Sequence, residues 1–217
     1  MSELSNLIQI SSKDIGIAFD KNKIQESFIS LSKSQKALKE IIEILNYRNG
    51  FMAFESALHF FHFSEEQKQD YNIIWWNNPE VWKSAYQNDK INSCFCFAED
   101  AFGNQFCFED DVIYSLDAET GEFEFIADSI ENWAEQILSD YEFFTGYSLI
   151  HNWQQENGAI PFGYRLIPKI PFCLGGEYSL DNLHAIELVK AMNWRGEIFN
   201  QIKDLPEGSQ INFSIIE

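Results

Sequence analysis

The sequence lacks long apolar runs and has no regular arrangement of cysteines. No segment approaches the roughly 18 apolar residues of a membrane-spanning helix. The first residues have neither the basic flank nor the apolar core of a signal peptide. Its four cysteines show no framework-like spacing, which is typical of reduced thiols. We therefore expect a cytoplasmic protein with no membrane partner.

Basic residues are missing from the middle of the chain. The segment between Lys90 and Arg165 has fifteen acidic residues and no lysine or arginine, in a chain of net charge -19. Because nucleic-acid phosphates are bound by cations, this composition argues against a nucleic-acid partner. A surface of one sign would attract a basic protein and speed its association. The solubility of an ordinary acidic protein is the alternative explanation.

Short signatures of common enzymes are also missing. The motifs GxGxxG, GxxxxGK[ST], HExxH and GxSxG do not occur. His59 and His62 lie among phenylalanines, so we expect structural roles for both. We predict that Cys94, Cys96 and Cys107 share one face of a hairpin, and a buried core is favoured over a zinc site there.

Paired carboxylates are the remaining candidates for chemistry. A glycosidase or nuclease would need two of them facing each other in a cleft. Predicted turn and outward strand positions favour solvated charge for Glu99-Asp100, for residues 109–111, and for Glu122 with Glu124. The sequence therefore predicts no enzyme activity and no catalytic, cofactor or metal site. A metal- or small-ligand-binding enzyme is the weakest alternative.

Alternating aromatic residues predict the centre of the fold. Strands containing Phe95 and Phe97, then Phe106 and Phe108, flank a turn at residues 103–104. Further strands are predicted over residues 112–116 and 122–126, joined by a turn with Gly121 in the left-handed conformation. These four strands form a predicted antiparallel meander.

Helical spacing predicts elements on both sides of this meander. Leu38, Ile41, Ile42 and Leu45 indicate a helix that ends at residues 49–50. Other helices are expected from Ser64 through residues 75–76, and from residue 128 or 129 to about 144. Residues 51–63 suit a buried helix face or an irregular segment, residues 15–19 a short strand or helix, and residues 25–31 a helical turn.

The last third predicts mixed structure. Prolines favour an extended stretch over residues 164–171. Residues 172–176 are expected to form a strand that ends in a glycine turn, residues 178–183 a further element, and residues 210–216 a strand. Residues 185–192 fit a strand or a helix, and residues 197–202 a helix. The fold class is therefore α+β, with a central antiparallel sheet flanked by helices, in a single domain over residues 1–217.

Three blocks of sequence resemble the SMI1/KNR4-like proteins of the SUKH superfamily. Residues 49–59 (NGFMAFESALH) resemble the family segment NGF-x-AFESALH. Residues 97–106 (FAEDAFGNQF) with 112–128 resemble its central hairpins, and residues 168–178 (PKIPFCLGGEY) with 201–208 (QIKDLPEG) resemble motifs of one bacterial branch. The resemblance covers residues 33–217, including the C-terminal portion from residue 164, and leaves residues 1–32 outside.

The resemblance implies an α+β domain with a central antiparallel sheet flanked by helices. For bacterial members it implies an immunity protein that binds and neutralises a cognate polymorphic or contact-dependent toxin, often a nuclease or a deaminase. It implies no catalytic residues, and the toxin-contacting residues cannot be carried over from the family. A regulatory scaffold that binds several partners is the alternative function.

Candidate partner-binding residues come from the acidic segment and from a tryptophan pair. Trp75 and Trp76 cannot both point inward from one helix, so one is expected at the surface as an interface anchor or as a cover for the sheet. The acidic candidates for contact with a basic toxin are Glu109, Asp110, Asp111, Glu122 and Glu124.

Overall fold

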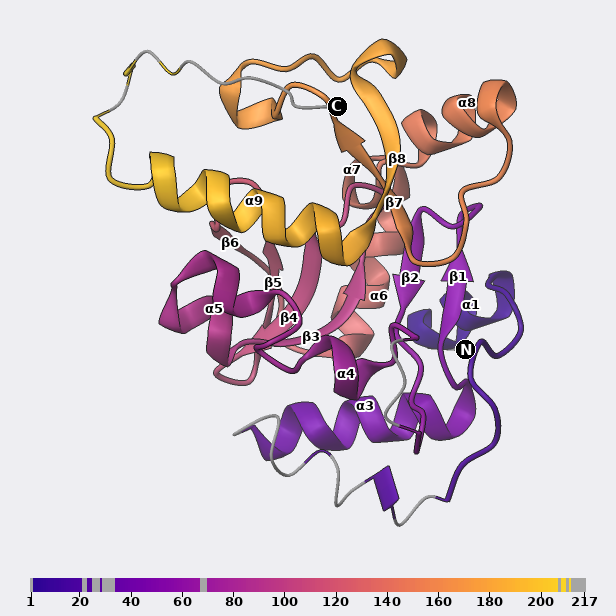
Figure 1. The fold of residues 1–217 in the computed structure, drawn as a ribbon. Coiled ribbons are helices and arrows are strands. Elements are labelled where there is room, and N and C mark those ends of the chain that lie inside the picture. Colours follow the sequence, from indigo (N-terminus) through magenta and orange to yellow (C-terminus); the bar gives the residue numbers. More distant parts are fainter. Residues whose placement is uncertain are drawn as a thin grey trace.

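A six-stranded sheet with helices on both faces forms the centre of the molecule (Figure 1). The computed structural model describes residues 2–20, 23, 24, 28, 34–66, 70–206, 208, 209 and 211. The strands run antiparallel in the order β1-β2-β3-β4-β5-β6. This confirms the predicted fold class, α+β with a central antiparallel sheet flanked by helices.

The centre of the sheet follows the aromatic alternation. Its strands are β3 (Phe95–Glu99), β4 (Gln105–Glu109), β5 (Val112–Leu116) and β6 (Phe123–Ala127). Phe95 pairs with Phe108 and Cys96 with Cys107, so the phenylalanines and the cysteines occupy opposite faces, as predicted. Gly121 has a φ of 69°, as expected for the turn before β6.

Two further strands correct the prediction for residues 51–63. β1 (Phe51–Ala53) pairs with β2 (Leu58–Phe60), and β2 pairs with β3. The connecting turn places Phe54, Glu55 and Ser56 at φ values of 51°, 53° and 74°. Successive left-handed residues other than glycine are unfavourable by about 1–2 kcal/mol each, so local sequence gave no indication of this hairpin.

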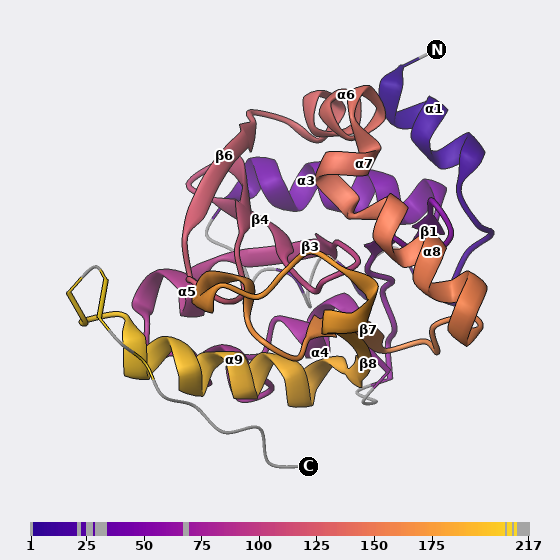
Figure 2. The same ribbon diagram turned by 90° about the horizontal axis from the view of Figure 1, so that it is seen from above.

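The helices form two layers, one on each side of the sheet. Figure 2 shows α1 (Glu3–Ile10), α3 (Gln35–Tyr47) and α6 (Ile130–Ser139) on one side of β3 and β4. On this side the ring of Trp133 contacts the rings of Phe60, Phe97 and Phe106. On the other side lie α4 (Ile73–Trp76), α5 (Asp89–Ser93) and α9 (Leu188–Ile202).

Two predicted helices are shorter in the structure. α4 begins after Asn72, whose side chain caps it, and not at Ser64. The predicted helix over residues 128–144 is interrupted at Asp140, which caps α7 (Tyr141–Thr145). The sequence did not predict α1, α5 or α8 (Tyr147–Asn157).

The C-terminal third adds a two-stranded sheet and a long helix. β7 (Tyr164–Pro168) pairs with β8 (Leu183–Glu187), and the short 3-10 helices η2 (Phe172–Leu174) and η3 (Leu180–Asn182) lie between them. The strand predicted from residue 172 was therefore wrong, whereas the predicted glycine turn is present, with Gly175 at a φ of 89°. Residues 185–192 contain both alternatives, because β8 ends at Glu187 and the Glu187 side chain caps α9.

Other predictions fall in the N- and C-terminal segments. Residues 15–19 form neither strand nor helix; the backbone of Ile15 and Gly16 bonds to that of Gly50 and Asn49. Residues 25–31 and 210–216 lie almost entirely outside the described residues. Within the described ranges, no helix combines the length and apolar character that crossing a bilayer requires.

Candidate protein-binding site

β6 forms one margin of the central sheet. In the described part of the chain β5 is its one strand neighbour, and Figure 2 shows β6 at the outer edge of the ribbon. Glu122 and Glu124 are exposed, and Phe125 is 58% exposed. A large exposed aromatic side chain next to exposed carboxylates is typical of a protein-binding surface. The β6 edge is defined by Lys90, Tyr114, Glu122, Phe123, Glu124 and Phe125.

Aromatic and acidic side chains occupy different faces of the β6 edge. Tyr114 is the cross-strand partner of Phe125, and its ring centroid lies 6.2 Å from that of Phe125 and 6.0 Å from that of Phe123. The Nζ atom of Lys90 lies over Phe123 and Tyr114, at 4.1 and 5.0 Å from their ring centroids. Because side chains alternate along a strand, Glu122 and Glu124 occupy the opposite face.

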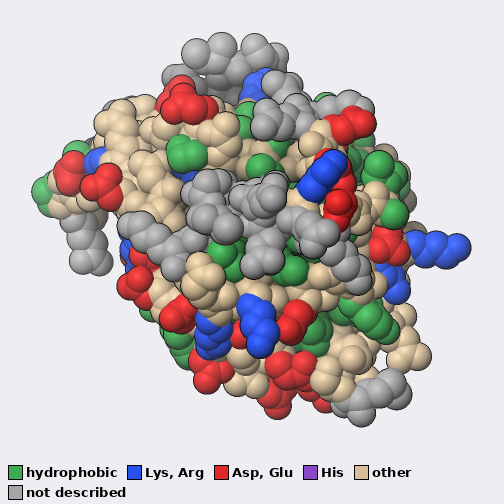
Figure 3. Space-filling model, turned by 90° about the horizontal axis from the view of Figure 1, so that it is seen from below, with side chains coloured by type: hydrophobic (Ala, Val, Ile, Leu, Met, Phe, Trp, Pro, Cys, Tyr) green, Lys and Arg blue, Asp and Glu red, His purple; other side chains and the backbone are tan. Residues whose placement is uncertain are grey.

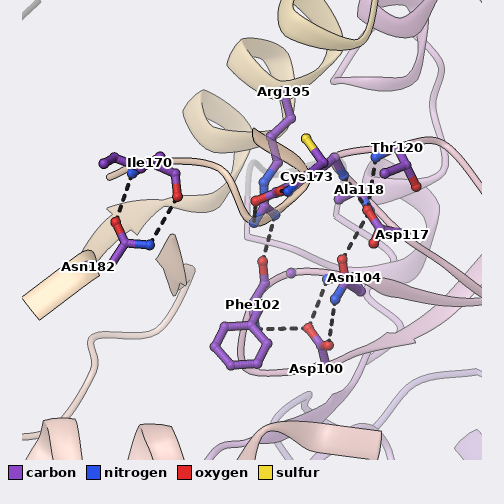
Figure 4. A network of polar contacts seen from close by, with 12 residues as sticks. Asp100, Phe102, Asn104, Asp117, Ala118, Thr120, Ile170, Cys173, Asn182 and Arg195 are labelled. Carbon is purple, nitrogen blue, oxygen red and sulfur yellow. Dashed lines mark hydrogen bonds and ion pairs between the residues drawn. The ribbon is translucent and has the colours of Figure 1, made fainter. Parts of the chain in front are cut away.

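The turn before β6 is held by hydrogen bonds from three elements. The Asp117 side chain accepts from the backbone N–H groups of Glu119 and Thr120 at 2.7 and 2.9 Å. The backbone N–H of Ala118 donates to Asn104 Oδ1 at 3.0 Å, as Figure 4 shows. On the other side the Tyr86 hydroxyl of η1 (Lys83–Tyr86) donates to the Ala118 carbonyl at 2.6 Å.

Residues of the C-terminal third also contact the turn before β6 and stabilise it. The buried Glu119 accepts from the backbone N–H of Cys173 at 3.0 Å, and the Arg195 guanidinium lies 3.6 Å from its other oxygen. Arg195 also donates to the Phe102 carbonyl at 2.6 Å (Figure 4). A Cβ atom on Gly121 would approach the Phe199 ring to 2.7 Å. The β6 edge is therefore presented by a rigid turn, which lowers the entropy cost of binding.

Asp100 shapes the neighbouring β3–β4 turn. Its carboxylate accepts from the backbone N–H groups of Phe102 and Asn104 and from the Asn104 side chain, each at 2.8 Å. Burial raises the pKa of Asp100 to about 7, although these donors favour its ionised form. By holding Asn104, Asp100 also supports the turn that leads into β6.

Glu99 belongs to a buried ionic cluster, so the expectation of a solvated Glu99-Asp100 pair was wrong. Glu99 Oε1 lies 2.9 Å from His59 Nδ1 and 2.6 Å from the Arg165 guanidinium. Burial opposes ionisation of Glu99, but Arg165 and the His59 hydrogen bond hold its pKa below the ordinary value. Arg165 lies far away in the sequence, so no local pattern revealed this pairing.

The two tryptophans of the predicted site lie in the α4 layer. Trp76 is fully buried, and its indole N–H donates to Gln105 Oε1 at 2.7 Å. Its assignment as a surface anchor was therefore wrong. Trp75 is half-buried, with its ring edge-to-face against Tyr71 at 5.4 Å. Trp75 and Trp76 do not join the β6 edge.

The acidic residues Glu109, Asp110 and Asp111 also lie apart from Glu122. They form the β4–β5 turn, at the far end of β5 from Glu122, about 15 Å away along a strand of this length. The Ser34 hydroxyl donates to the Asp111 carboxylate, and Lys36 Nζ donates to the Asp111 carbonyl at 3.4 Å. Through these contacts the β4–β5 turn stabilises the N-terminal end of α3.

Of the predicted residues, the structure places Glu122 and Glu124 together at the β6 edge. Lys90, Tyr114 and the two phenylalanines of this edge were not among the predicted residues. The alternation Glu-Phe-Glu-Phe over residues 122–125 could have predicted this edge. On an outer strand it places two aromatic side chains on one face and two carboxylates on the other.

The prediction that Cys94, Cys96 and Cys107 lie in the core on one face of the hairpin is confirmed. Cys94, Cys96 and Cys107 are buried on the face opposite the phenylalanines, with the sulfurs of Cys94 and Cys96 3.8 Å apart. Cys173 is exposed. Over the described ranges, no group of three or more His, Cys, Asp or Glu residues is arranged to hold a metal ion.

A second acidic surface lies between α1, α3 and α6. These helices enclose a groove of about 320 Å³ with Glu40, Glu43 and Glu131 in its lining. Glu40 accepts from the backbone N–H of Ile130 at 2.7 Å, and Glu131 from that of Glu3 at 2.5 Å, so both carboxylates cap neighbouring helices.

On the lower face of the molecule, where α3 lies in Figure 1, basic and acidic side chains are interspersed (Figure 3).

Comparisons with known proteins inform the fold. No protein family and no curated protein matches the sequence. Among solved structures, the chain is similar to the crystal structure of Atu4351 from Agrobacterium tumefaciens, with a TM-score of 0.60 and 12% sequence identity. The match covers 88% of this chain and 87% of that chain. At this identity the likeness supports the fold alone.

Proposed function

We propose that this chain is a non-enzymatic immunity protein of the SMI1/KNR4-like proteins, which binds and neutralises a cognate toxin in the bacterial cytoplasm. The toxin is a basic protein domain, such as a nuclease or a deaminase, encoded by a neighbouring gene. The observation that carries the proposal is the β6 edge, where exposed Glu122 and Glu124 lie on one face and exposed Phe125 on the other. The three family-like sequence blocks support the same assignment.

Occlusion of the toxin is the proposed mechanism. The buried acids Glu99 and Glu119 lie against Arg165 and Arg195, so the charge available to a partner belongs to the exposed carboxylates. These carboxylates accelerate encounter with a cationic surface, and an aromatic anchor such as Phe125 slows dissociation. The anchored turn before β6 holds this surface in one conformation.

Co-expression tests the proposal. The chain is expressed with the toxin domain encoded by the adjoining open reading frame, and cell survival and a complex on a sizing column are measured. The double variant Glu122→Lys, Glu124→Lys is expected to slow association about 10-fold at low salt and less at high salt. The control Glu156→Lys changes an exposed acid of α8, on the other side of the molecule (Figure 2). Toxicity unaltered by the chain, with no complex, would contradict the proposal.

A regulatory scaffold with several partners is the second candidate. The observation that favours it is the groove between α1, α3 and α6, which is separate from the β6 edge and has no lysine or arginine in its lining. A pull-down from the native host should then return several unrelated proteins, and Glu43→Lys in the groove should remove a different subset from Glu122→Lys at β6. Recovery of one neighbour-encoded protein alone favours the immunity function.

A further inference from the structure

We propose that the β6 edge binds an added antiparallel strand, supplied by a partner protein and alternating basic with apolar residues. This inference names the recognition mode of the proposed immunity function, and it rests on that function for the identity of the partner. The mode itself follows from the backbone direction and the side-chain alternation of β6.

The backbone groups of Phe123 and Phe125 face away from β5. The Asp117 N–H donates to the Glu122 carbonyl at 2.9 Å, so the backbone of Glu122 faces β5. Antiparallel pairing alternates the direction of successive residues, so Phe123 faces outward, Glu124 faces β5 beside its partner Ser115, and Phe125 faces outward. An open edge with outward N–H and C=O groups is a template for another strand.

The side chains of β6 specify the composition of that strand. Residues directly opposite each other in adjacent strands share a face and interact. Partner residues beside Glu122 and Glu124 gain from positive charge, and those beside Phe123 and Phe125 from apolar side chains. A strand with these two faces alternates Lys or Arg with apolar residues.

A second copy of this chain fits the β6 edge poorly. A symmetric antiparallel pair that uses the outward backbone groups must place odd-numbered residues opposite odd-numbered residues. In the registers centred on Phe123 and on Glu124, Glu122 lies opposite Glu124 of the second copy, or Glu124 lies opposite its own counterpart. Like charges directly opposite each other are destabilising, so the glutamates select against self-pairing and in favour of a basic strand.

Protection of the open strand edge against unwanted pairing does not explain why Phe125 is exposed. Charged side chains on an outer strand prevent unwanted pairing, and Glu122 and Glu124 could serve that purpose. However, Phe125 is 58% exposed on the other face, where it extends the aromatic surface of Tyr114 and Phe123. An exposed phenylalanine weakens protection and strengthens docking of an apolar face.

A peptide titration tests the recognition mode without the toxin. The probe is a synthetic peptide of about seven alternating Lys and Val residues, the length of a typical strand. The control peptide has the same composition with its lysines in one block. The alternating peptide is expected to shift the amide resonances of Phe123 and Phe125 and to slow their hydrogen exchange, and the block peptide to bind at least about 10-fold more weakly. Equal binding of both peptides, or shifts confined to other elements, overturns the inference.

Charge variants and the oligomeric state complete the test. Glu122→Lys with Glu124→Lys is expected to weaken binding of the alternating peptide by about 10-fold or more, whereas Glu156→Lys leaves it unchanged. A concentration-dependent dimer that Phe125→Asp abolishes would overturn the inference in favour of a second copy.

The complex with the toxin separates this inference from the proposed function. Neutralisation with no protection of the Phe123 and Phe125 amides contradicts strand addition and leaves the immunity function standing. Docking of the alternating peptide at β6, together with failure to neutralise the neighbour-encoded toxin, contradicts the immunity function and supports strand addition.

Discussion

Lys90 Nζ lies 4.1 Å from the centre of the Phe123 ring. The last lysine before the segment without basic residues thus folds back onto that segment. Replacement of Lys90 by Gln removes this cation–π contact and the one with Tyr114, and should lower the free energy of unfolding by about 0.5–1 kcal/mol. Urea denaturation measures this, with Lys39→Gln on the exposed side of α3 as the control. Equal stability of both variants would show that Lys90 contributes nothing here.

Replacement of Arg165 by Met should destabilise the protein strongly. The variant leaves Glu99 buried without the guanidinium 2.6 Å away, and breaking a buried pair in this way costs about 3–5 kcal/mol. Removing the second charge as well, in Arg165→Met with Glu99→Gln, should recover most of the loss. Chemical denaturation of both variants tests this. Lys23→Met, which breaks an exposed pair with Glu65, should destabilise the protein far less than Arg165→Met.

The stability of the folded state should depend on His59 as the pH falls. Burial lowers the pKa of His59 from 6.5 to about 4. The unfolded state therefore takes up a proton first, and the stability that is complete above pH 6.5 declines as the pH falls toward 4. Between pH 7 and 5 the loss should be about 2 kcal/mol.

The variant His59→Gln isolates this effect. The wild type loses stability through His59 as the pH falls from 7 to 5, and the variant does not. The unfolding free energy of the wild type should therefore exceed that of the variant by less at pH 5 than at pH 7. Asp100 acts in the opposite sense, because its raised pKa gives stability that is complete at low pH and declines as the pH rises to about 7. Both proteins contain Asp100, so its contribution cancels in the comparison. A difference that stays constant with pH would rule out His59 as the titrating group.

Replacement of Gly121 by Ala should destabilise the turn that presents β6. The new Cβ would lie 2.7 Å from the Phe199 ring, at a backbone φ of 69°. Gly175→Ala is a matched control, with a left-handed backbone at a φ of 89° and no atom within 4 Å. Both variants should lose about 1 kcal/mol to backbone strain, and Gly121→Ala a further 1–3 kcal/mol to the steric clash. Equal losses in urea denaturation would mean that Phe199 yields without cost.

Much of the central sheet could be predicted from the sequence. Residues 95–97 and 106–108 alternate aromatic with smaller side chains, and Gly121 supplies the left-handed turn before β6. These are short-range patterns, because side-chain direction along a strand depends on residues two positions apart. The helix that contains Leu38 and Ile41 was also predictable, because residues three and four positions apart share a face of a helix. The hairpin of β1 and β2 was not, because its turn places three non-glycine residues in the left-handed conformation.

The candidate site was predicted in part. The sequence by itself determined that Glu122 and Glu124 alternate with phenylalanines on an outer strand. Only the tertiary structure decided that Trp76 is buried, that Asp111 holds α3, and that Lys90 covers Phe123. It also decided that Glu99 lies against Arg165 in the interior. The physical reason is range: alternation is a property of neighbouring residues, whereas the pairing and burial of a charge depend on residues that the fold brings from far along the chain.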